Sequence, residues 1–324
     1  MNIAYSSSDS FSWLAGISLV SLLENNKTID KINIFILENG ISDINKNKLA
    51  EIVNKYNRKI TFISFAKVAK ITDKLNIEDR WNPSTFGSLF LAQLVPADIE
   101  KILCIDCDTI VNSSIENLWN TNIDNKAVFG VKECLSSKYL KRIGNSSNDI
   151  MLNAGLLLFN LKYIRENDTV TKFSNKIKNS SSLLYLDQDV LNSVLSNNEK
   201  GVLDFKYNAY SLIYYCNYKQ IKLARHPANF YSKEDFENAK SNPVIIHFTT
   251  CFLDSGRTWN ILCNHPLKNK FLFYKQISPY SKDSLIENDK SKVKRNKLFK
   301  LFPRTFLCWI TGLIHAYVRP VLKK

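Results

Sequence analysis

Glycine is scarce in this chain: there are nine glycines in 324 residues, and none belongs to a GxGxxG or GxxxxGK[ST] pattern. Glycine-rich loops of these kinds let backbone N–H groups approach the phosphates of dinucleotides, ATP or GTP. Their absence disfavours a dinucleotide-dependent dehydrogenase and a P-loop enzyme. If a nucleotide binds to this chain, another group must neutralise its phosphates, and a divalent metal ion is the natural substitute.

Features of a secreted or membrane-spanning protein are also missing. The seven cysteines are odd in number and have no framework spacing, which favours a reducing compartment. The first residues contain neither a basic segment nor an apolar segment of signal-peptide length. No uncharged apolar run reaches the roughly 18 residues that a spanning helix needs. We therefore expect a cytoplasmic protein.

Acidic residues are absent from positions 290–324, which contain ten lysines and arginines. The rest of the chain carries 34 basic and 30 acidic side chains, so it accounts for only +4 of the formal net charge of +14. The basic character therefore belongs to the tail and gives little support to nucleic-acid binding. The sequence also contains no base-reading motif, and we expect no nucleic-acid partner.

The basic tail contains an apolar segment, 305–318, that is rich in aromatic and aliphatic residues. Its composition predicts an amphipathic helix that is too short to span a bilayer and lies at the membrane interface. Lysines and arginines of the tail would meet anionic lipid head groups. The alternative is an ordinary C-terminal helix that packs on the core. Because the chain turns polar and basic near residue 281, we expect a catalytic or binding domain at 1–280 and a membrane-associating tail at 281–324.

Short apolar runs alternate with helical patterns through the first third of the chain. This alternation is typical of an α/β protein in which a mostly parallel sheet is covered by helices on both faces. Ser42 has the position of a helix N-cap. We expect strands at 3–5, 32–37, 60–65 and 101–105, and helices around 13–23, 42–56 and 86–95.

Asp106 and Asp108 follow the strand expected at 101–105. Alternate side chains of an extended chain point the same way, so both carboxylates would face one point beyond the strand. Sheets of this kind bind ligands there, and paired carboxylates suit Mg²⁺ or Mn²⁺. The alternative is a solvated turn that happens to contain two aspartates. Cys104 and Cys107 form a CxxC, but no second pair completes a zinc site, and in a strand they face opposite ways.

Other polar residues fit two interpretations each. His247, after an apolar run, is either a neutral imidazole ligand of the same metal ion or a hydrogen-bonded histidine beside the core. Asp187 and Gln188 begin a helical pattern and either face a polar ligand or, with Asp189, belong to a helix cap. The same ambiguity between ligand binding and a structural role holds for Asn153 and Arg257.

Four separated segments together carry a recognisable pattern. They are Ile3-Ala4-Tyr5-Ser6-Ser7-Ser8-Asp9, Leu103-Cys104-Ile105-Asp106-Cys107-Asp108-Thr109, Asn153-Ala154-Gly155 with Asp187-Gln188-Asp189, and Ile246-His247-Phe248 with Arg257-Thr258-Trp259. Across about residues 2–265 the chain resembles the retaining glycosyltransferases of family 8, which include bacterial lipopolysaccharide galactosyl- and glucosyltransferases and glycogenin. Each motif is weak alone, but four motifs in the same order are specific.

The resemblance implies a GT-A fold, a UDP-sugar donor and a Mn²⁺ ion, with Mg²⁺ as the alternative metal. It assigns metal binding to Asp106, Asp108 and His247. It makes Asp187 and Gln188 the catalytic residues, with Gln188 beneath the anomeric carbon of the donor. Phe11 would stack on the uracil base, and Arg257 would contact the diphosphate. The full set of implied donor-binding residues is Ala4, Ser6, Ser8, Phe11, Asp106, Cys107, Asn153, Ala154, Asp187, Gln188 and Arg257.

The sequence departs from the family pattern at three places. Ser8 stands where an acidic residue is common, and Ser88 stands near a position usually filled by arginine. The last motif reads Arg-Thr-Trp in place of Lys-Pro-Trp, which keeps the positive charge with a different geometry. These departures concern the identity of the donor more than the type of reaction.

We therefore expect a hexosyltransferase that moves glucose or galactose from a UDP-sugar to a saccharide hydroxyl with retention of configuration. The expected setting is the synthesis of lipopolysaccharide or another surface polysaccharide, on the inner face of the cytoplasmic membrane, where the acceptor can be lipid-linked. The alternative is a non-catalytic nucleotide-sugar-binding protein of the same fold.

Overall fold

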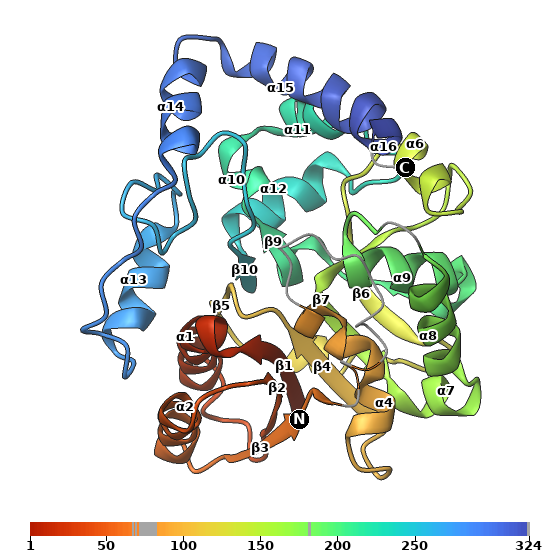
Figure 1. Cartoon of the computed structure of the whole chain (residues 1–324), viewed down its shortest axis with the longest axis vertical. Helices are drawn as coiled ribbons and strands as arrows, with labels where there is room; N and C mark the ends of the chain where they lie inside the picture. The colour runs from red at the N-terminus through yellow and green to blue at the C-terminus, as the bar shows by residue number, and fades with distance from the viewer. Residues whose placement is uncertain (67, 69, 71–82, 181–182, 323–324) are drawn as a thin grey trace.

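The computed structural model describes residues 1–66, 68, 70, 83–180 and 183–322 (Figure 1). Its main sheet is built from β1 (Asn2–Ser8), β2 (Asn33–Asn39), β3 (Lys59–Ser64), β4 (Lys101–Ile105), β6 (Val128–Lys132), β7 (Leu152–Asn160) and β8 (Lys200–Val202). The strand order is β3-β2-β1-β4-β7-β6-β8. β7 runs antiparallel to β4 and β6, and the other neighbouring strands are parallel. The four expected strands and the mostly parallel sheet are therefore confirmed.

Alternation along the strands divides the core into two apolar clusters, one on each face of the sheet. In β1, Ile3 and Tyr5 belong to one cluster and Ala4 to the other. α1 (Ser12–Glu24) and α2 (Asp43–Lys55) cover the first face, while α7 (Leu161–Glu166), α8 (Thr169–Asn179) and α9 (Leu186–Val194) cover the second (Figure 1). Cys104 and Cys107 fall into different clusters, as expected for residues on opposite faces.

α2 begins at the predicted cap. The Ser42 hydroxyl accepts a hydrogen bond from the Asn45 N–H at 3.4 Å. The Asp9 carboxylate, just beyond β1, accepts from the Ser42 N–H, the Ser42 hydroxyl and the Asn45 side-chain amide, each at 2.8 Å. These bonds fix the start of α2 beside the carboxyl end of β1.

The helix expected around 86–95 is present and begins earlier, at Pro83. The segment forms the 3-10 helix η2 (Pro83–Phe90), followed by a single α-helical turn, α4 (Leu91–Leu94). Phe86, Leu89 and Phe90 are all buried, whereas Gln93 is exposed. A Cβ atom on Gly87 would lie 2.8 Å from the Ser6 hydroxyl and 3.1 Å from a Leu37 methyl carbon. This close approach to β1 and β2 shapes the segment, and hydropathy alone does not reveal it.

A second sheet of three strands lies against the end of the first. It contains β5 (Thr109–Val111), β9 (Ala209–Tyr210) and β10 (Ile245–His247), with β10 in the middle. β10 is antiparallel to β5, and this register sets His247 opposite Thr109. Because β5 follows the turn after β4, the second sheet brings a distant part of the chain beside Asp106 and Asp108.

Short helices complete the globular part. They are η1 (Asp9–Phe11), α5 (Glu116–Trp119), α6 (Ser137–Arg142), η3 (Asn197–Glu199), η4 (Phe205–Asn208), α10 (Leu212–Tyr215), α11 (Tyr218–Arg225), α12 (Lys233–Ser241) and α13 (Lys268–Gln276).

The tail consists of α14 (Lys290–Phe299), α15 (Arg304–Leu313), the π-helical turn η5 (Ile314–Val318) and α16 (Arg319–Leu322). α15 packs so closely on α11 that a Cβ on Gly312 would come within 1.8 Å of the Leu223 carbonyl oxygen (Figure 1). Leu307, Cys308 and Ala316 are buried in the same contact. The outer side of the tail exposes Leu301, Phe302, Phe306, Trp309, Leu313, Ile314, Tyr317, Val318 and Val321.

The tail therefore combines both interpretations of its sequence: one side packs on the core, and the other presents apolar residues to solvent. Its association with a membrane and the division of the chain at residue 281 stay predictions. Within the described part of the chain, every helix is too short or too polar to reach across a bilayer.

Candidate active site

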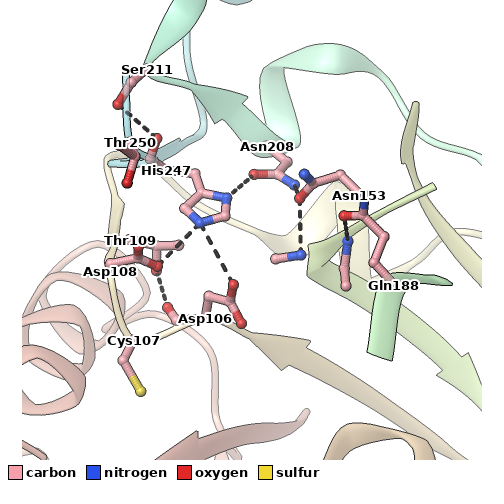
Figure 2. A network of polar contacts seen from close by, with 12 residues as sticks. Asp106, Cys107, Asp108, Thr109, Asn153, Gln188, Asn208, Ser211, His247 and Thr250 are labelled. Atoms are coloured by element: carbon pink, nitrogen blue, oxygen red, sulfur yellow. Dashed lines mark hydrogen bonds and ion pairs between the residues drawn. The ribbon is translucent and has the colours of Figure 1, made fainter. Parts of the chain in front are cut away.

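Two aspartates and a histidine meet at the carboxyl end of β4. Asp106 and Asp108 directly follow β4, as predicted, and lie in the turn between β4 and β5. The His247 Nε2 atom lies 3.1 Å from an Asp108 carboxylate oxygen and 3.6 Å from an Asp106 carboxylate oxygen (Figure 2). One ligand atom from each residue falls within 4.8 Å of the other two. The three predicted metal ligands are thus brought together in a group that can hold a metal ion.

The protonation of this group follows from its surroundings. Burial by itself would lower the pKa of His247, but the Asp108 and Asp106 carboxylates outweigh burial and raise it. Burial would raise the pKa of Asp108, whereas the His247 and Arg257 cations beside it outweigh burial and lower it. The two carboxylates therefore favour positive charge at this point, which a proton on His247 or a divalent cation could supply.

The orientation of the His247 ring is set by a chain of hydrogen bonds (Figure 2). The Asn153 side-chain oxygen accepts from the Gly155 N–H at 2.9 Å and from the Asn208 amide nitrogen at 2.8 Å. The Asn208 oxygen therefore faces the His247 Nδ1 atom, 2.9 Å away. Nδ1 must donate to it, which leaves Nε2 pointing at the aspartates as a ligand atom. Glu133 anchors the chain, since its carboxylate accepts from the Asn153 amide at 2.5 Å.

Gly155 leaves the space that the His247 ring occupies. A Cβ at this position would lie 2.1 Å from the His247 Cε1 atom and 2.5 Å from Nδ1. No side chain fits there without moving the ring. The sequence motif Asn153-Ala154-Gly155 thus combines a hydrogen-bonding residue with a steric requirement. Asn208 and Glu133 were not among the predicted site residues, because nothing in their local sequence marks them.

Asp187 and Gln188 lie buried in the first turn of α9. The Gln188 side-chain oxygen accepts a hydrogen bond from the Ala154 N–H at 3.0 Å, which joins α9 to the β7 motif. Burial raises the pKa of Asp187, and the nearby Asp106 carboxylate adds to the shift. The Asp189 carboxylate accepts hydrogen bonds from the Leu184 and Tyr185 N–H groups at 2.9 and 3.1 Å. Asp189 therefore has a structural role at the start of α9, which is one of the two interpretations of its sequence position.

Of the predicted base-binding residues, Ala4 lies within β1, Ser6 and Ser8 lie toward its carboxyl end, and Phe11 is the last residue of η1. The Ser6 hydroxyl donates to the Ser84 carbonyl at 2.5 Å, and the Cys107 thiol lies 3.2 Å from the Ser6 carbonyl oxygen. Ala4 is fully buried and Ser8 is nearly so, whereas Phe11 is 44% exposed. Phe11 is thus free to stack on a ligand. The buried Ser88 hydroxyl has no hydrogen-bond partner among the described residues.

Arg257 reaches the same group from the loop after β10. Its guanidinium donates to the second Asp108 carboxylate oxygen at 2.5 Å and to the Thr250 hydroxyl at 3.0 Å. It also lies 5.2 Å from the centre of the Trp259 ring. The guanidinium thus contacts a carboxylate of the candidate metal group, and its contact with a diphosphate stays a prediction. Its cation lies directly beside the place where a metal-bound phosphate would be held.

Fold and site together define a class, the GT-A glycosyltransferases. A crystal structure of the galactosyltransferase LgtC, in complex with donor and acceptor sugar analogues, matches this chain with a TM-score of 0.70 and 20% identity. The match covers 86% of this chain and 96% of that one. At this identity the likeness establishes the fold, and it confirms the predicted GT-A arrangement.

The chain belongs to glycosyl transferase family 8, because the sequence model of that family matches residues 2–252. A putative glycosyltransferase of Haemophilus influenzae is 29% identical over 221 residues, which are 65% of this chain and 63% of that protein. The lipopolysaccharide 1,2-glucosyltransferase of Escherichia coli is 24% identical over 286 residues, which are 86% of this chain and 79% of that enzyme. The chain thus spans less than two thirds of the Haemophilus protein and most of the E. coli enzyme.

Proposed function

We propose that this chain transfers glucose or galactose from a UDP-sugar to a saccharide hydroxyl with retention of configuration, in the synthesis of lipopolysaccharide or another surface polysaccharide. The observation that carries the proposal is the group of Asp106, Asp108 and His247 at the end of β4, with Asp187 and Gln188 close by. Family membership supports the reaction type. The names of the similar proteins include both a glucosyltransferase and a galactosyltransferase, so both sugars are retained.

Asp106, Asp108 and His247 would hold the metal ion, which we propose to be Mn²⁺ or Mg²⁺. Two carboxylate oxygens and one imidazole nitrogen form a donor set that suits such ions. When bound, the ion would supply Lewis-acid neutralisation of the diphosphate that leaves with uridine. Arg257 would add a second positive charge on the same side, because its guanidinium already lies against Asp108.

The donor would lie between the end of β1 and the first turn of α9. Phe11 would stack on the base. Gln188 would lie beneath the anomeric carbon, and Asp187 would bind sugar hydroxyls. We propose attack from the face of the leaving group, with a phosphate oxygen taking the acceptor proton. The remaining donor contacts are assigned to Ala4, Ser6, Ser8, Asp106, Cys107, Asn153, Ala154 and Arg257.

The tail suits an anionic membrane surface. Ten basic residues at 290–324 accompany the apolar side chains exposed on the outer side of α15 and η5. Basic residues beside exposed tryptophan and phenylalanine are typical of helices that lie at the membrane interface. We propose that the tail holds the protein on the inner face of the cytoplasmic membrane, where a lipid-linked acceptor would be presented.

The test is the slow release of UDP in the absence of acceptor. Purified protein is mixed with UDP-glucose or UDP-galactose, with and without Mn²⁺, and free UDP is measured. We expect metal-dependent release from one of the donors and its loss in Asp108→Ala. UDP binding without release from either donor would favour the non-catalytic alternative. If calorimetry also detects no UDP binding, the proposed function is wrong.

A further inference from the structure

The C-terminal segment contacts the residue that directly precedes α9. The Tyr185 hydroxyl lies 3.1 Å from the His315 Nε2 atom and accepts a hydrogen bond from Arg319 at 2.9 Å. The Arg319 guanidinium also lies 4.9 Å from the centre of the Tyr185 ring. His315 and Arg319 are four positions apart in the helical tail, so both reach the same side chain. Tyr185 is only two residues from Asp187.

The chemistry of the three side chains fixes the direction of one of these bonds. Arginine has no acceptor, so Arg319 donates to the Tyr185 oxygen. The Tyr185 hydroxyl and the His315 Nε2 atom form the second hydrogen bond, whose direction depends on the histidine tautomer. Burial lowers the pKa of His315 to about 2, and the Arg225 and Arg319 cations add to the shift, so the ring stays neutral. The single hydroxyl of Tyr185 thus binds both side chains of the tail.

Tyr185 belongs to a turn that is held from two sides. The Asp189 carboxylate accepts from the Leu184 and Tyr185 N–H groups, and both of its oxygens accept from the Tyr139 hydroxyl at 2.8 and 2.9 Å. The Tyr139 and Tyr185 rings are in contact, with centres 5.3 Å apart. Leu186, the next residue, has a φ of +39°, which is unfavourable for a leucine. Such a backbone persists only where its surroundings fix it.

The tail segment itself is fixed to the domain. The Ser136 hydroxyl, at the start of α6, donates to the Ala316 carbonyl at 3.1 Å. Gly312 allows the close approach of α15 to α11, and Ala316 is fully buried. His315 and Arg319 therefore meet Tyr185 from a helix whose position along the domain is set by independent contacts.

We propose that His315 and Arg319 are positioning residues for transfer: by holding Tyr185 they keep the turn at 184–186, and with it Asp187 and Gln188, in the geometry that the donor sugar requires. The tail then supports the geometry of the active site in addition to contacting a membrane. The inference deepens the proposed function and rests on it. The roles of the two residues are indirect, because neither approaches the candidate metal ligands.

The test uses the full-length protein and the acceptor-free release of UDP, which requires no membrane. The variants are His315→Ala, Arg319→Ala and Tyr185→Phe, the last of which keeps the ring and removes only the hydroxyl. We expect kcat to fall by about tenfold or more in each, because small displacements of catalytic groups are costly. KM for the donor and the Kd for UDP and Mn²⁺ should stay within about twofold, since the metal group is not touched. His315→Gln, which keeps a side chain that can hydrogen-bond to Tyr185, should recover much of kcat.

Ile314→Ser is the matched control, because Ile314 neighbours His315 and is 53% exposed. It should release UDP at the wild-type rate. Wild-type kcat in both Arg319→Ala and Tyr185→Phe would overturn the inference, as would an equal loss in Ile314→Ser. Hydrogen exchange of residues 184–190 gives a readout that needs no activity. If the wild type releases no UDP, the proposed function fails, and unchanged exchange at 184–190 in Arg319→Ala would separately overturn the coupling.

Discussion

At the scale of single residues, Asn208 sets the orientation of His247, the candidate metal ligand at the end of β10. The Asn153 side-chain oxygen is fixed by a backbone N–H and accepts a hydrogen bond from the Asn208 amide nitrogen. The Asn208 oxygen therefore faces the Nδ1 atom of His247. Residues that hydrogen-bond to a metal-binding histidine fix its tautomer, and their loss typically weakens metal binding substantially.

Asn208→Ala is expected to weaken Mn²⁺ binding by about 10- to 100-fold, because the His247 ring loses the partner that fixes its tautomer. Calorimetric titration of the purified variant with Mn²⁺ measures the effect. Ser211→Ala is the control, since the Ser211 hydroxyl donates to the His247 backbone carbonyl and its loss should leave the affinity unchanged. Wild-type affinity in Asn208→Ala would show that the relay does not matter for binding.

Arg257 forms an ion pair with Asp108, a candidate ligand of the metal ion. Arg257→Ala should therefore bind Mn²⁺ about fivefold more tightly in the absence of nucleotide, which corresponds to the loss of one partly exposed ion pair. The same variant should bind UDP in the presence of Mn²⁺ more weakly, because a cation beside the diphosphate is lost. Two calorimetric titrations test this, and a parallel weakening of both affinities would contradict it.

Asp187 and Gln188 are expected to act on the sugar and not on the nucleotide. Asp187→Asn and Gln188→Ala should each reduce transfer by about 100-fold or more while the affinity for UDP stays close to that of the wild type. The comparison requires turnover and UDP binding to be measured on the same preparations. Wild-type turnover in either variant would remove that residue from the catalytic assignment.

At the scale of elements, the tail contributes one helix with two different sides. α15 packs closely on α11 at Gly312, while Phe306 and Trp309 face outward and are 41% and 46% exposed. Deletion of 290–324 would uncover α11 and remove the contacts to Tyr185 as well. Point substitutions on the outer side are therefore the sharper test of membrane binding.

The double variant Phe306→Ser, Trp309→Ser is expected to bind anionic vesicles at least about tenfold more weakly, because each ring that enters the interface contributes a kcal/mol or more. Cosedimentation with vesicles of phosphatidylglycerol and phosphatidylethanolamine measures it. Phe273→Ser is the control, since Phe273 is 55% exposed on α13 and lies outside the tail. UDP release in solution should be unchanged. Equal binding of both variants would exclude the tail as the membrane contact.

The local sequence pattern does not predict the geometry of every short element. Segment 86–95 forms η2 and α4 because it is enclosed by β1, β2 and α9, so its 3-10 geometry is imposed from outside. α2, by contrast, has an apolar face and a start marked by the Ser42 cap, and its sequence predicts it well.

At the scale of the whole molecule, stability should depend on pH through a buried histidine. His265 is enclosed by Tyr214, Tyr215 and Phe248, and burial lowers its pKa to about 4 although Asp254 opposes the shift. In the unfolded chain this histidine takes up a proton near pH 6.5, whereas in the folded protein it stays neutral down to about pH 4. The fold therefore has its full stability above pH 6.5 and loses stability as the pH falls toward 4. The loss amounts to about 2 kcal/mol between pH 7 and pH 5.

Urea unfolding at pH 7 and pH 5 tests this. The wild-type free energy of unfolding should fall between the two pH values by about 2 kcal/mol more than that of His265→Gln, which has no titrating group at this position. The variant is expected to be less stable than the wild type at pH 7, because the Leu267 N–H loses the His265 Nδ1 acceptor. An equal pH dependence of both proteins would show that His265 titrates normally in the fold.

The sequence by itself determined the alternation of strands and helices and the position of Asp106 and Asp108 at the end of a strand. These features depend on residues close together in the chain, whose hydropathy period and spacing can be read directly. The GT-A fold class and the assignment of His247 to the metal group followed from the resemblance of the separated motifs to family 8. Only the tertiary structure decided how His247 lies beside the two aspartates, that Asn208 and Glu133 support it, and that Gly155 makes room for the ring. These residues are separated by tens of positions, and their contacts arise from the packing of β10 on β5 and of β7 beside β4. The contact of His315 and Arg319 with Tyr185 belongs to the same category, because it joins the last helix of the chain to the start of α9 through space alone.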